Sequence, residues 1–202
     1  MDLTDGALSP GPIVVGATRP YPRETANGDA WHVDRLEHTT RIALIDGLGH
    51  GPDAALAAQR AVVCLRNYPD LSPSDALRVC HAALSGSRGA ALSIALVDSY
   101  TRRLTYAGVG NVEALLWVAG RQSRPIAYRG IIGATLPTLR SSEHDLGDAW
   151  ILLLHTDGIS SRLDPPSLPE FGMRAHQQLA DAALARWGRT SDDATVVVAA
   201  PS

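Results

Sequence analysis

Four aspartates in this chain stand where apolar segments begin or end, a position from which carboxylates can bind hard divalent cations. Asp46 follows the apolar run Ile42–Ile45 and opens the glycine-rich sequence Asp-Gly-Leu-Gly-His-Gly. Asp29, Asp157 and Asp192 also border apolar runs, and a glycine or a second acid stands beside each of them. Several carboxylates at one site can hold two cations, which activate water and bind phosphate oxygens. The pattern therefore predicts a metal site for hydrolysis, built from these four aspartates.

A simpler interpretation of these residues is a set of turns. Asp-Gly is a common turn dipeptide, in which the aspartate accepts hydrogen bonds from nearby backbone amides. For Asp46 or Asp157 taken alone, the turn is the better interpretation, but the four positions together favour the metal site. Gly47 adds a backbone carbonyl as a further oxygen ligand, because a glycine there leaves space for the cation.

A hairpin is expected to bring two of these aspartates together. Residues 30–36 alternate loosely and 41–45 are apolar, with a polar turn at 37–40 between them. The ends of two antiparallel strands lie side by side, so Asp29 and Asp46 should meet at one end of a sheet.

The remaining elements follow from hydrophobic periodicity and from helix-start signals. Pro52 and Pro73 are well placed as first helical residues, and Ser72 as an N-cap. The pattern predicts helices over 52–67, 73–84 and 174–187, and further strands over 13–16, 89–98, 103–109, 112–118, 150–155 and 194–200. Short turns join the three middle strands, which predicts an antiparallel meander. Strands and helices occur in blocks, which favours a layered α+β fold over a doubly wound parallel sheet.

Composition limits the classes of function. A chain of 202 residues with 45% hydrophobic content can form one core, so we expect a single domain over 1–202. A net charge of −3 gives no basic surface for nucleic acid or for a membrane. The first residues do not resemble a signal peptide, so a soluble cytoplasmic protein is expected. Cys64 and Cys80 fall among apolar residues and are expected to be buried thiols rather than a disulfide.

Five short motifs resemble those of the type 2C metal-dependent Ser/Thr protein phosphatases (PPM), and most of all the bacterial SpoIIE/RsbX-like branch. They are Gly28-Asp29, Asp46-Gly47-Leu48-Gly49-His50-Gly51, Gly108-Val109-Gly110-Asn111, His155-Thr156-Asp157-Gly158 and Asp192-Asp193-Ala194-Thr195. The resemblance extends from about Gly28 to Val198. It implies a four-layer αββα sandwich, in which helices flank two antiparallel sheets, as one PPM-type domain.

The resemblance also implies a role for each matching residue. Two Mn²⁺ or Mg²⁺ ions would be held by Asp29, Asp46, Gly47, Asp157 and Asp192. Asp46 would bridge the two ions with the Gly47 carbonyl beside it, so Asp46 and Asp29 are the residues expected to be essential for catalysis. Asp193 matches a variable position, where it would contact the metal ligands without touching the metal, or act as an alternative ligand.

The implied reaction is direct attack of metal-activated water on phosphoserine or phosphothreonine, without a phosphoenzyme. The implied substrate is a phosphorylated STAS-domain regulator of a stressosome-type stress-signalling complex, similar to RsbS or RsbR proteins. One alternative is a catalytically inactive relative that only binds a regulatory partner. Another is a hydrolase of small phosphoesters.

Two departures from the family concern proton transfer and phosphate binding. Larger relatives carry a histidine where this chain has Leu48, and His50 is either a substitute general acid or a solvated loop residue. Arg23 is the candidate for phosphate binding, because a guanidinium fork suits phosphate oxygens, and a surface arginine is the alternative. Arg88 and Arg129 are two other loop arginines with the same chemistry.

Overall fold

The structure, a computed structural model, describes residues 11–22 and 24–202, and its strands form two sheets. Sheet A has the strand order β1-β11-β10-β6-β7, and sheet B the order β2-β3-β4-β5-β8 with β9 paired to β5. The strands of sheet A are β1 (Ile13–Arg19), β6 (Glu113–Val118), β7 (Arg121–Ser123), β10 (Trp150–His155) and β11 (Ala194–Ala200). Those of sheet B are β2 (Asp29–Arg35), β3 (Thr39–Gly47), β4 (Ala90–Asp98), β5 (Arg103–Val109), β8 (Ala127–Tyr128) and β9 (Ser142–Asp145).

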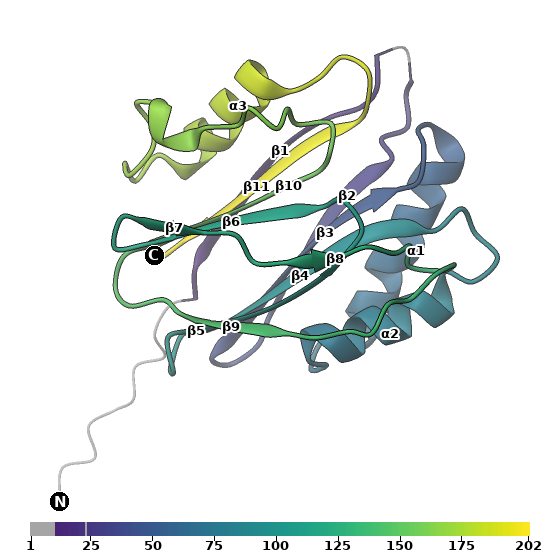
Figure 1. The fold of residues 1–202 in the computed structure, drawn as a ribbon, viewed down its shortest axis with the longest axis horizontal. Helices are drawn as coiled ribbons and strands as arrows, with labels where there is room; N and C mark the ends of the chain where they lie inside the picture. Colours follow the sequence, from purple (N-terminus) through teal and green to yellow (C-terminus); the bar gives the residue numbers. More distant parts are fainter. Residues whose placement is uncertain (1–10, 23) are drawn as a thin grey trace, which may run out of the picture.

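The three α-helices within the described residues cover the outer faces of the two sheets (Figure 1). Helices α1 (Pro52–Asn67) and α2 (Pro73–Ala83) pack on sheet B, and α3 (His176–Trp187) packs on sheet A. A short 3-10 helix, η1 (Pro165–Ser167), precedes α3. None of the described helices is long and apolar enough to cross a membrane.

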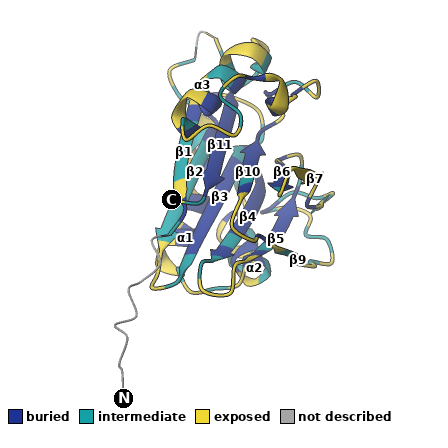
Figure 2. Ribbon diagram, turned by 90° about the vertical axis from the view of Figure 1, so that its left-hand side faces the viewer, coloured by how far each residue is buried: buried dark blue, intermediate teal, exposed yellow. Residues whose placement is uncertain are grey.

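Three apolar clusters separate the four layers. One lies between sheet B and helices α1 and α2, one between the two sheets, and one between sheet A and α3. The central strands are buried, whereas the outer surfaces of the helices and the connecting loops are exposed (Figure 2). The expected α+β sandwich with four αββα layers is confirmed, with one parallel strand pair, β5–β8, in an otherwise antiparallel sheet B.

The expected three-stranded meander is wrong, because the chain changes sheets after β5. β4 and β5 form a hairpin, but β6 pairs with β10 in sheet A. Gly110 makes the change possible: its φ is +99°, and a Cβ there would lie 2.4 Å from the Cβ of Ala91. A short apolar strand after a tight turn usually continues a meander, but β6 is buried on both faces. Leu116 faces the other sheet and Leu115 faces α3, which is the environment of a central strand.

The helix starts follow the local signals in the sequence. Gly51 precedes α1, which begins at Pro52, and the Oγ of Ser72 accepts a hydrogen bond from the amide of Asp75 at the start of α2. The third helix begins at His176, two residues later than expected. Cys64 and Cys80 are buried free thiols, as expected.

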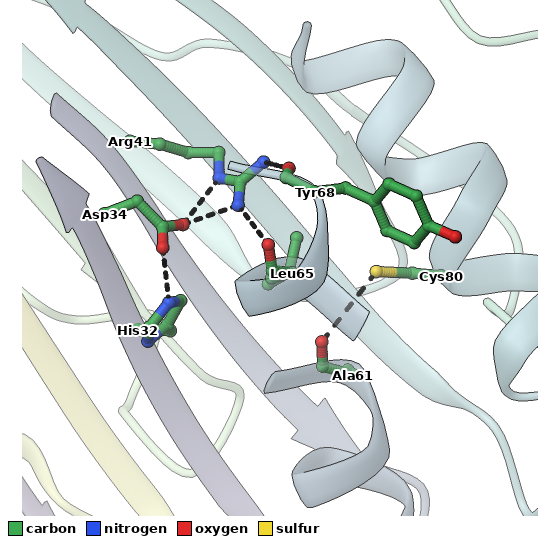
Figure 3. A network of polar contacts seen from close by, with 7 residues as sticks. All are labelled: His32, Asp34, Arg41, Ala61, Leu65, Tyr68 and Cys80. Atoms are coloured by element: carbon green, nitrogen blue, oxygen red, sulfur yellow. Dashed lines mark hydrogen bonds and ion pairs between the residues drawn. The ribbon is translucent and has the colours of Figure 1, made fainter. Parts of the chain in front are cut away.

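A buried arginine ties α1 to sheet B at the end of the sheet opposite Asp46 (Figure 3). The Arg41 side chain is 1% exposed, and its Nε donates a hydrogen bond to Oδ2 of Asp34 at 2.9 Å. Its guanidinium also donates to the carbonyl oxygens of Leu65 and Tyr68, both at 2.6 Å. His32 contacts the other oxygen of Asp34 at 2.8 Å. Arg41 thus adds side-chain donors to two carbonyl groups at the end of α1, where a helix has few backbone donors.

Arg41→Leu should lower the free energy of unfolding by about 3–5 kcal/mol, because it removes one partner of a largely buried ion pair and the side-chain donor to the carbonyl of Tyr68. Urea unfolding followed by circular dichroism measures this loss. Arg66→Ala removes an exposed arginine from the last turn of the same helix and should change the stability by no more than about 0.5 kcal/mol. A loss below about 1 kcal/mol for Arg41→Leu would show that the hydrogen bonds of Arg41 contribute little to the free energy of unfolding.

Candidate metal and phosphate site

Asp29 and Asp46 lie directly opposite each other at one end of sheet B. The antiparallel register of β2 and β3 pairs Asp29 with Asp46, and it continues to Arg35 opposite Thr40. Opposed residues on one face of a sheet have Cβ atoms about 5 Å apart. The hairpin expected from the sequence, and the meeting of its two ends, are therefore confirmed.

The turn after Asp46 is held tightly against its neighbours. The amide of Gly47 donates to the carbonyl of Gly28 at 3.0 Å, and the amide of Leu48 donates to the carbonyl of Gly89 at 3.0 Å. A Cβ on Gly47 would lie 2.1 Å from the carbonyl oxygen of Ala54, so only glycine fits. This close packing fixes the backbone of Gly47 beside the Asp46 carboxylate.

Asp157 approaches from sheet A, where it follows the last residues of β10. It is exposed, and its Oδ2 accepts a hydrogen bond from Nδ2 of Asn111 at 2.6 Å. Asn111 lies at the point where the chain passes from β5 to β6. The sequence analysis gave Asn111 no role, although it closes the Gly-Val-Gly-Asn motif. Asn111 lies next to Asp157 because the chain passes there from sheet B to sheet A.

Two threonines connect Asp29 to sheet A. The hydroxyl of Thr156 donates to Oδ2 of Asp29 at 2.8 Å, and the amide of Thr195 donates to the Thr156 hydroxyl at 3.0 Å. Both threonines are fully buried. The sequence offers a signal for them only in retrospect, because each stands within three residues of a predicted ligand. They hold Asp29 in a fixed orientation where the two sheets meet.

Asp192 and Asp193 occupy different environments at the start of β11. Asp192 is half-buried, whereas Asp193 is 3% exposed. Oδ1 of Asp193 accepts a hydrogen bond from the amide of Tyr21 at 2.8 Å, and its Oδ2 is buried without a hydrogen-bond partner in the described part of the chain. Asp193 therefore anchors the loop that leads to Asp29.

Burial and mutual repulsion change the acidity of three of these carboxyl groups. Burial first, and then the charges of neighbouring aspartates, raises the pKa of Asp46 to about 9. Burial also raises the pKa of Asp29 to about 7, although hydrogen bonds from Thr195 and Thr156 oppose the shift. The pKa of Asp192 is raised by burial and by the charge of Asp157. These groups would lose their protons more readily beside a cation.

The acidic side chains do not form a ready metal cage in the orientations seen here. Within residues 11–22 and 24–202, no group of three His, Cys, Asp or Glu side chains is arranged to hold a metal ion. The four predicted aspartates nevertheless influence one another: the charges of Asp29, Asp157 and Asp192 all act on Asp46. The structure thus gathers them at one end of the sandwich without placing their oxygens around a common point.

The candidates for proton transfer and phosphate binding are His50 and three arginines, and of these His50 and Arg88 lie at the turn after Asp46. His50 is exposed and stacks on Tyr21 with ring centroids 4.5 Å apart, and its Nδ1 is 3.3 Å from Oε1 of Glu24. Arg23 lies outside the described residues. Arg88 pairs with Asp53 beside the Asp46–Gly51 turn. Arg129 is exposed and has no polar partner in the described part of the chain.

Comparisons with known proteins agree with this architecture. A family model described as stage II sporulation protein E (SpoIIE) matches residues 37–201. The phosphoserine phosphatase RsbX of Bacillus subtilis (strain 168) is 25% identical over 134 residues, which cover 66% of this chain and 67% of that protein.

Solved structures give the same result. A chain from a structure of the bacterial stressosome, described as a modular system adapted to control secondary messenger signalling, has a TM-score of 0.87 and 32% identity, covering 92% of this chain and 97% of its own. The crystal structure of RsbX in complex with magnesium has a TM-score of 0.83 at 21% identity, with 94% of each chain covered, and supports the fold alone. The extent of the family match and the similarity to these relatives show that the chain belongs to the SpoIIE family of PP2C-type serine/threonine phosphatases.

Proposed function

We propose that this chain is a Mn²⁺- or Mg²⁺-dependent phosphoserine/phosphothreonine protein phosphatase, with residues 1–202 as one catalytic domain. The observation that carries the proposal is the pair Asp29 and Asp46, opposed at the end of sheet B and joined there by acids from sheet A. Membership of the SpoIIE family supports the reaction class.

The donor set fits two hard divalent cations. Asp29, Asp46, Asp157 and Asp192 supply carboxylate oxygens and Gly47 a carbonyl oxygen, the ligand types that Mg²⁺ and Mn²⁺ prefer. Burial first, and the charges of neighbouring aspartates after it, raise the pKa of Asp29 to about 7 and that of Asp46 to about 9, and a bound cation would oppose both effects. Asp157 and Asp192 are the more exposed of the four, so their side chains have room to turn toward the buried pair. The magnesium in the RsbX crystal structure is consistent with this choice of metal.

Each group of the chain then has a defined task. Bound divalent ions supply an acidified water as nucleophile and neutralise the charge of the phosphate group. Asp46, on which the charges of Asp29, Asp157 and Asp192 act, would supply a carboxylate at the centre of the ligand set, and Thr156 keeps Asp29 in its orientation. Asn111 orients Asp157 by donating to one of its oxygens. Asp193 fixes the loop before Asp29 through the amide of Tyr21 rather than contacting the reacting atoms.

The proposed substrate is a phosphorylated STAS-domain protein of a stressosome-type complex. Support comes from the relatives: one is the phosphoserine phosphatase RsbX, and another belongs to a structure of the bacterial stressosome. The rival function is that of a catalytically inactive module that binds such a partner. Retention of every family ligand position disfavours the rival, because a binding module has no need for four carboxylates gathered at one end of the sandwich.

Asp46→Asn should reduce Mn²⁺-stimulated hydrolysis of p-nitrophenyl phosphate by at least about a hundredfold, because it removes a central negative charge that would hold the cations. Asp70→Asn, an exposed aspartate remote from the site, serves as the matched control and should retain full activity. Native activity in Asp46→Asn would refute the two-metal site. A native protein that binds a phosphorylated STAS domain, yet releases no phosphate with Mn²⁺ or Mg²⁺, would establish the rival function.

The stability of the protein without metal should fall as the pH rises from about 4 to about 9. Asp29 and Asp46 have pKa values raised from 3.8 to about 7 and about 9, so the folded protein retains protons that the unfolded chain has lost. Urea midpoints in EDTA at pH 5, 7 and 9 measure the trend. Asp29→Asn/Asp46→Asn should flatten it, and added Mn²⁺ should reverse it for the wild type. A midpoint that rises with pH in EDTA would contradict the raised pKa values.

Asn111→Ala should weaken activation by Mn²⁺ about tenfold or more, because Asp157 loses the group that orients it. The measurement is a titration of phosphatase activity with MnCl₂. Asn67→Ala, at the exposed end of α1, is the control and should leave the titration unchanged. An unchanged titration for Asn111→Ala would mean that the orientation of Asp157 has no bearing on metal binding.

A further inference from the structure

A basic groove lies directly beside the Asp46–Gly51 turn. It has a volume of about 360 Å³ and is lined by Asp53, Leu56 and Arg60 of α1 and by Gly86, Ser87 and Arg88 of the loop before β4. None of these residues belongs to the carboxylate cluster described above. The groove extends the surface of that cluster along α1.

Arg88 is positioned at the inner end of the groove by its own loop. The hydroxyl of Ser87 donates to the carbonyl of Leu84 at 2.6 Å and accepts from the amide of Gly89 at 3.1 Å. The carbonyl of Gly89 accepts from the amide of Leu48, so the loop is joined to the turn after Asp46. As a result, Nη1 of Arg88 is 3.0 Å from the position that a Cβ on Gly49 would occupy.

The groove carries more positive than negative charge. Arg88 pairs with Asp53 at 3.0 Å, and both side chains are about half or more exposed. Exposed pairs of this kind are weak and exchange partners readily. Arg60 has no ion-pair or hydrogen-bond partner within residues 11–22 and 24–202, so its charge is available to an incoming acid.

The outer face of α1 adds apolar contacts to these charges. Leu56, Arg60 and Val63 follow one another at helical spacing, and Leu56 and Val63 are 52% and 48% exposed. A purely solvated face would carry polar side chains at these positions. Alternating aliphatic and cationic groups suit a peptide that has both apolar and acidic residues.

On the basis of the function proposed above, we infer that this groove binds an acidic segment of the protein substrate, next to its phosphorylated residue. The segment lies extended along α1, with its carboxylates on Arg88 and Arg60 and an apolar residue on Leu56. Helical rise places Arg60 about 10 Å from Asp53, which an extended peptide covers in about three residues. The chain therefore selects phosphoproteins with acidic residues within about five positions of the phosphate.

The test compares two synthetic phosphoserine peptides that differ only in flanking Glu or flanking Gln residues. The wild type should hydrolyse the Glu peptide with a kcat/KM about tenfold higher, through a lower KM, and added salt should reduce this preference. In Arg60→Ala/Arg88→Ala the preference should disappear. Arg60→Ala alone should reduce the preference while p-nitrophenyl phosphate hydrolysis stays at the native rate. Arg78→Ala, which removes an exposed arginine paired with Asp75 on α2, should keep the preference.

The ion pair within the groove provides a second, sharper comparison. Asp53→Ala frees Arg88, so the preference for the Glu peptide should be retained or increased. If the pair were only structural, Asp53→Ala and Arg88→Ala would have the same effect, and that result overturns the inference. Equal loss on both peptides and on p-nitrophenyl phosphate also overturns it, because it would place Arg88 at the reacting phosphate. A third result would also overturn the inference: if the wild type is a dimer and Leu56→Asp dissociates it, a second copy of the chain covers this face.

Binding separates this inference from the proposed reaction. The fluorescence anisotropy of a labelled, unphosphorylated Glu peptide should show weaker binding to Arg60→Ala/Arg88→Ala than to the wild type. This measurement needs no turnover. If no phosphoester is hydrolysed with any divalent cation, the proposed phosphatase fails while the groove is still judged by anisotropy. Equal affinity of the two proteins for the peptide overturns the groove.

Discussion

The register of one strand pair is the constraint on which the candidate site depends. Side chains alternate between the faces of a strand, so a slip of one residue between β2 and β3 would send Asp29 and Asp46 to opposite faces of sheet B. The same slip would exchange the two buried faces of β3, moving Ile42 and Leu44 out of the space between the sheets and toward the helices. The core therefore enforces the register, and the register places two repelling carboxylates together.

The protein maintains this unfavourable pair by surrounding it with rigid contacts. Gly47 is packed against the backbone of Ala54, and the Thr156 hydroxyl holds Asp29 from the neighbouring sheet. At the far end of sheet B, Arg41 fixes the end of α1, the helix that begins beside Asp46. These contacts thus hold two carboxyl groups in a place where burial disfavours their ionised forms.

Local signals in the sequence were sufficient for most of the elements and for the hairpin. The helix starts at Pro52 and Pro73 and the pairing of Asp29 with Asp46 depend on neighbours close in the chain, so periodicity and turn chemistry reveal them. The passage of β6 into sheet A could not be read in the same way, because a tight turn is compatible with either sheet. Asn111 was missed for that reason: its contact with Asp157 exists only after the two sheets have come together.

The origin of the acids in different sheets has a mechanical consequence. Asp29 and Asp46 belong to sheet B, whereas Asp157 and Asp192 follow or precede strands of sheet A. A cation held by both pairs would be a reversible cross-link between two layers that are otherwise in contact mainly through apolar side chains. Unlike a disulfide, it would bind only the folded chain, so it would stabilise the sandwich by an amount that grows with the cation concentration. Binding of the divalent cation would then require that the two sheets are assembled, so cation binding and folding of the sandwich would be coupled.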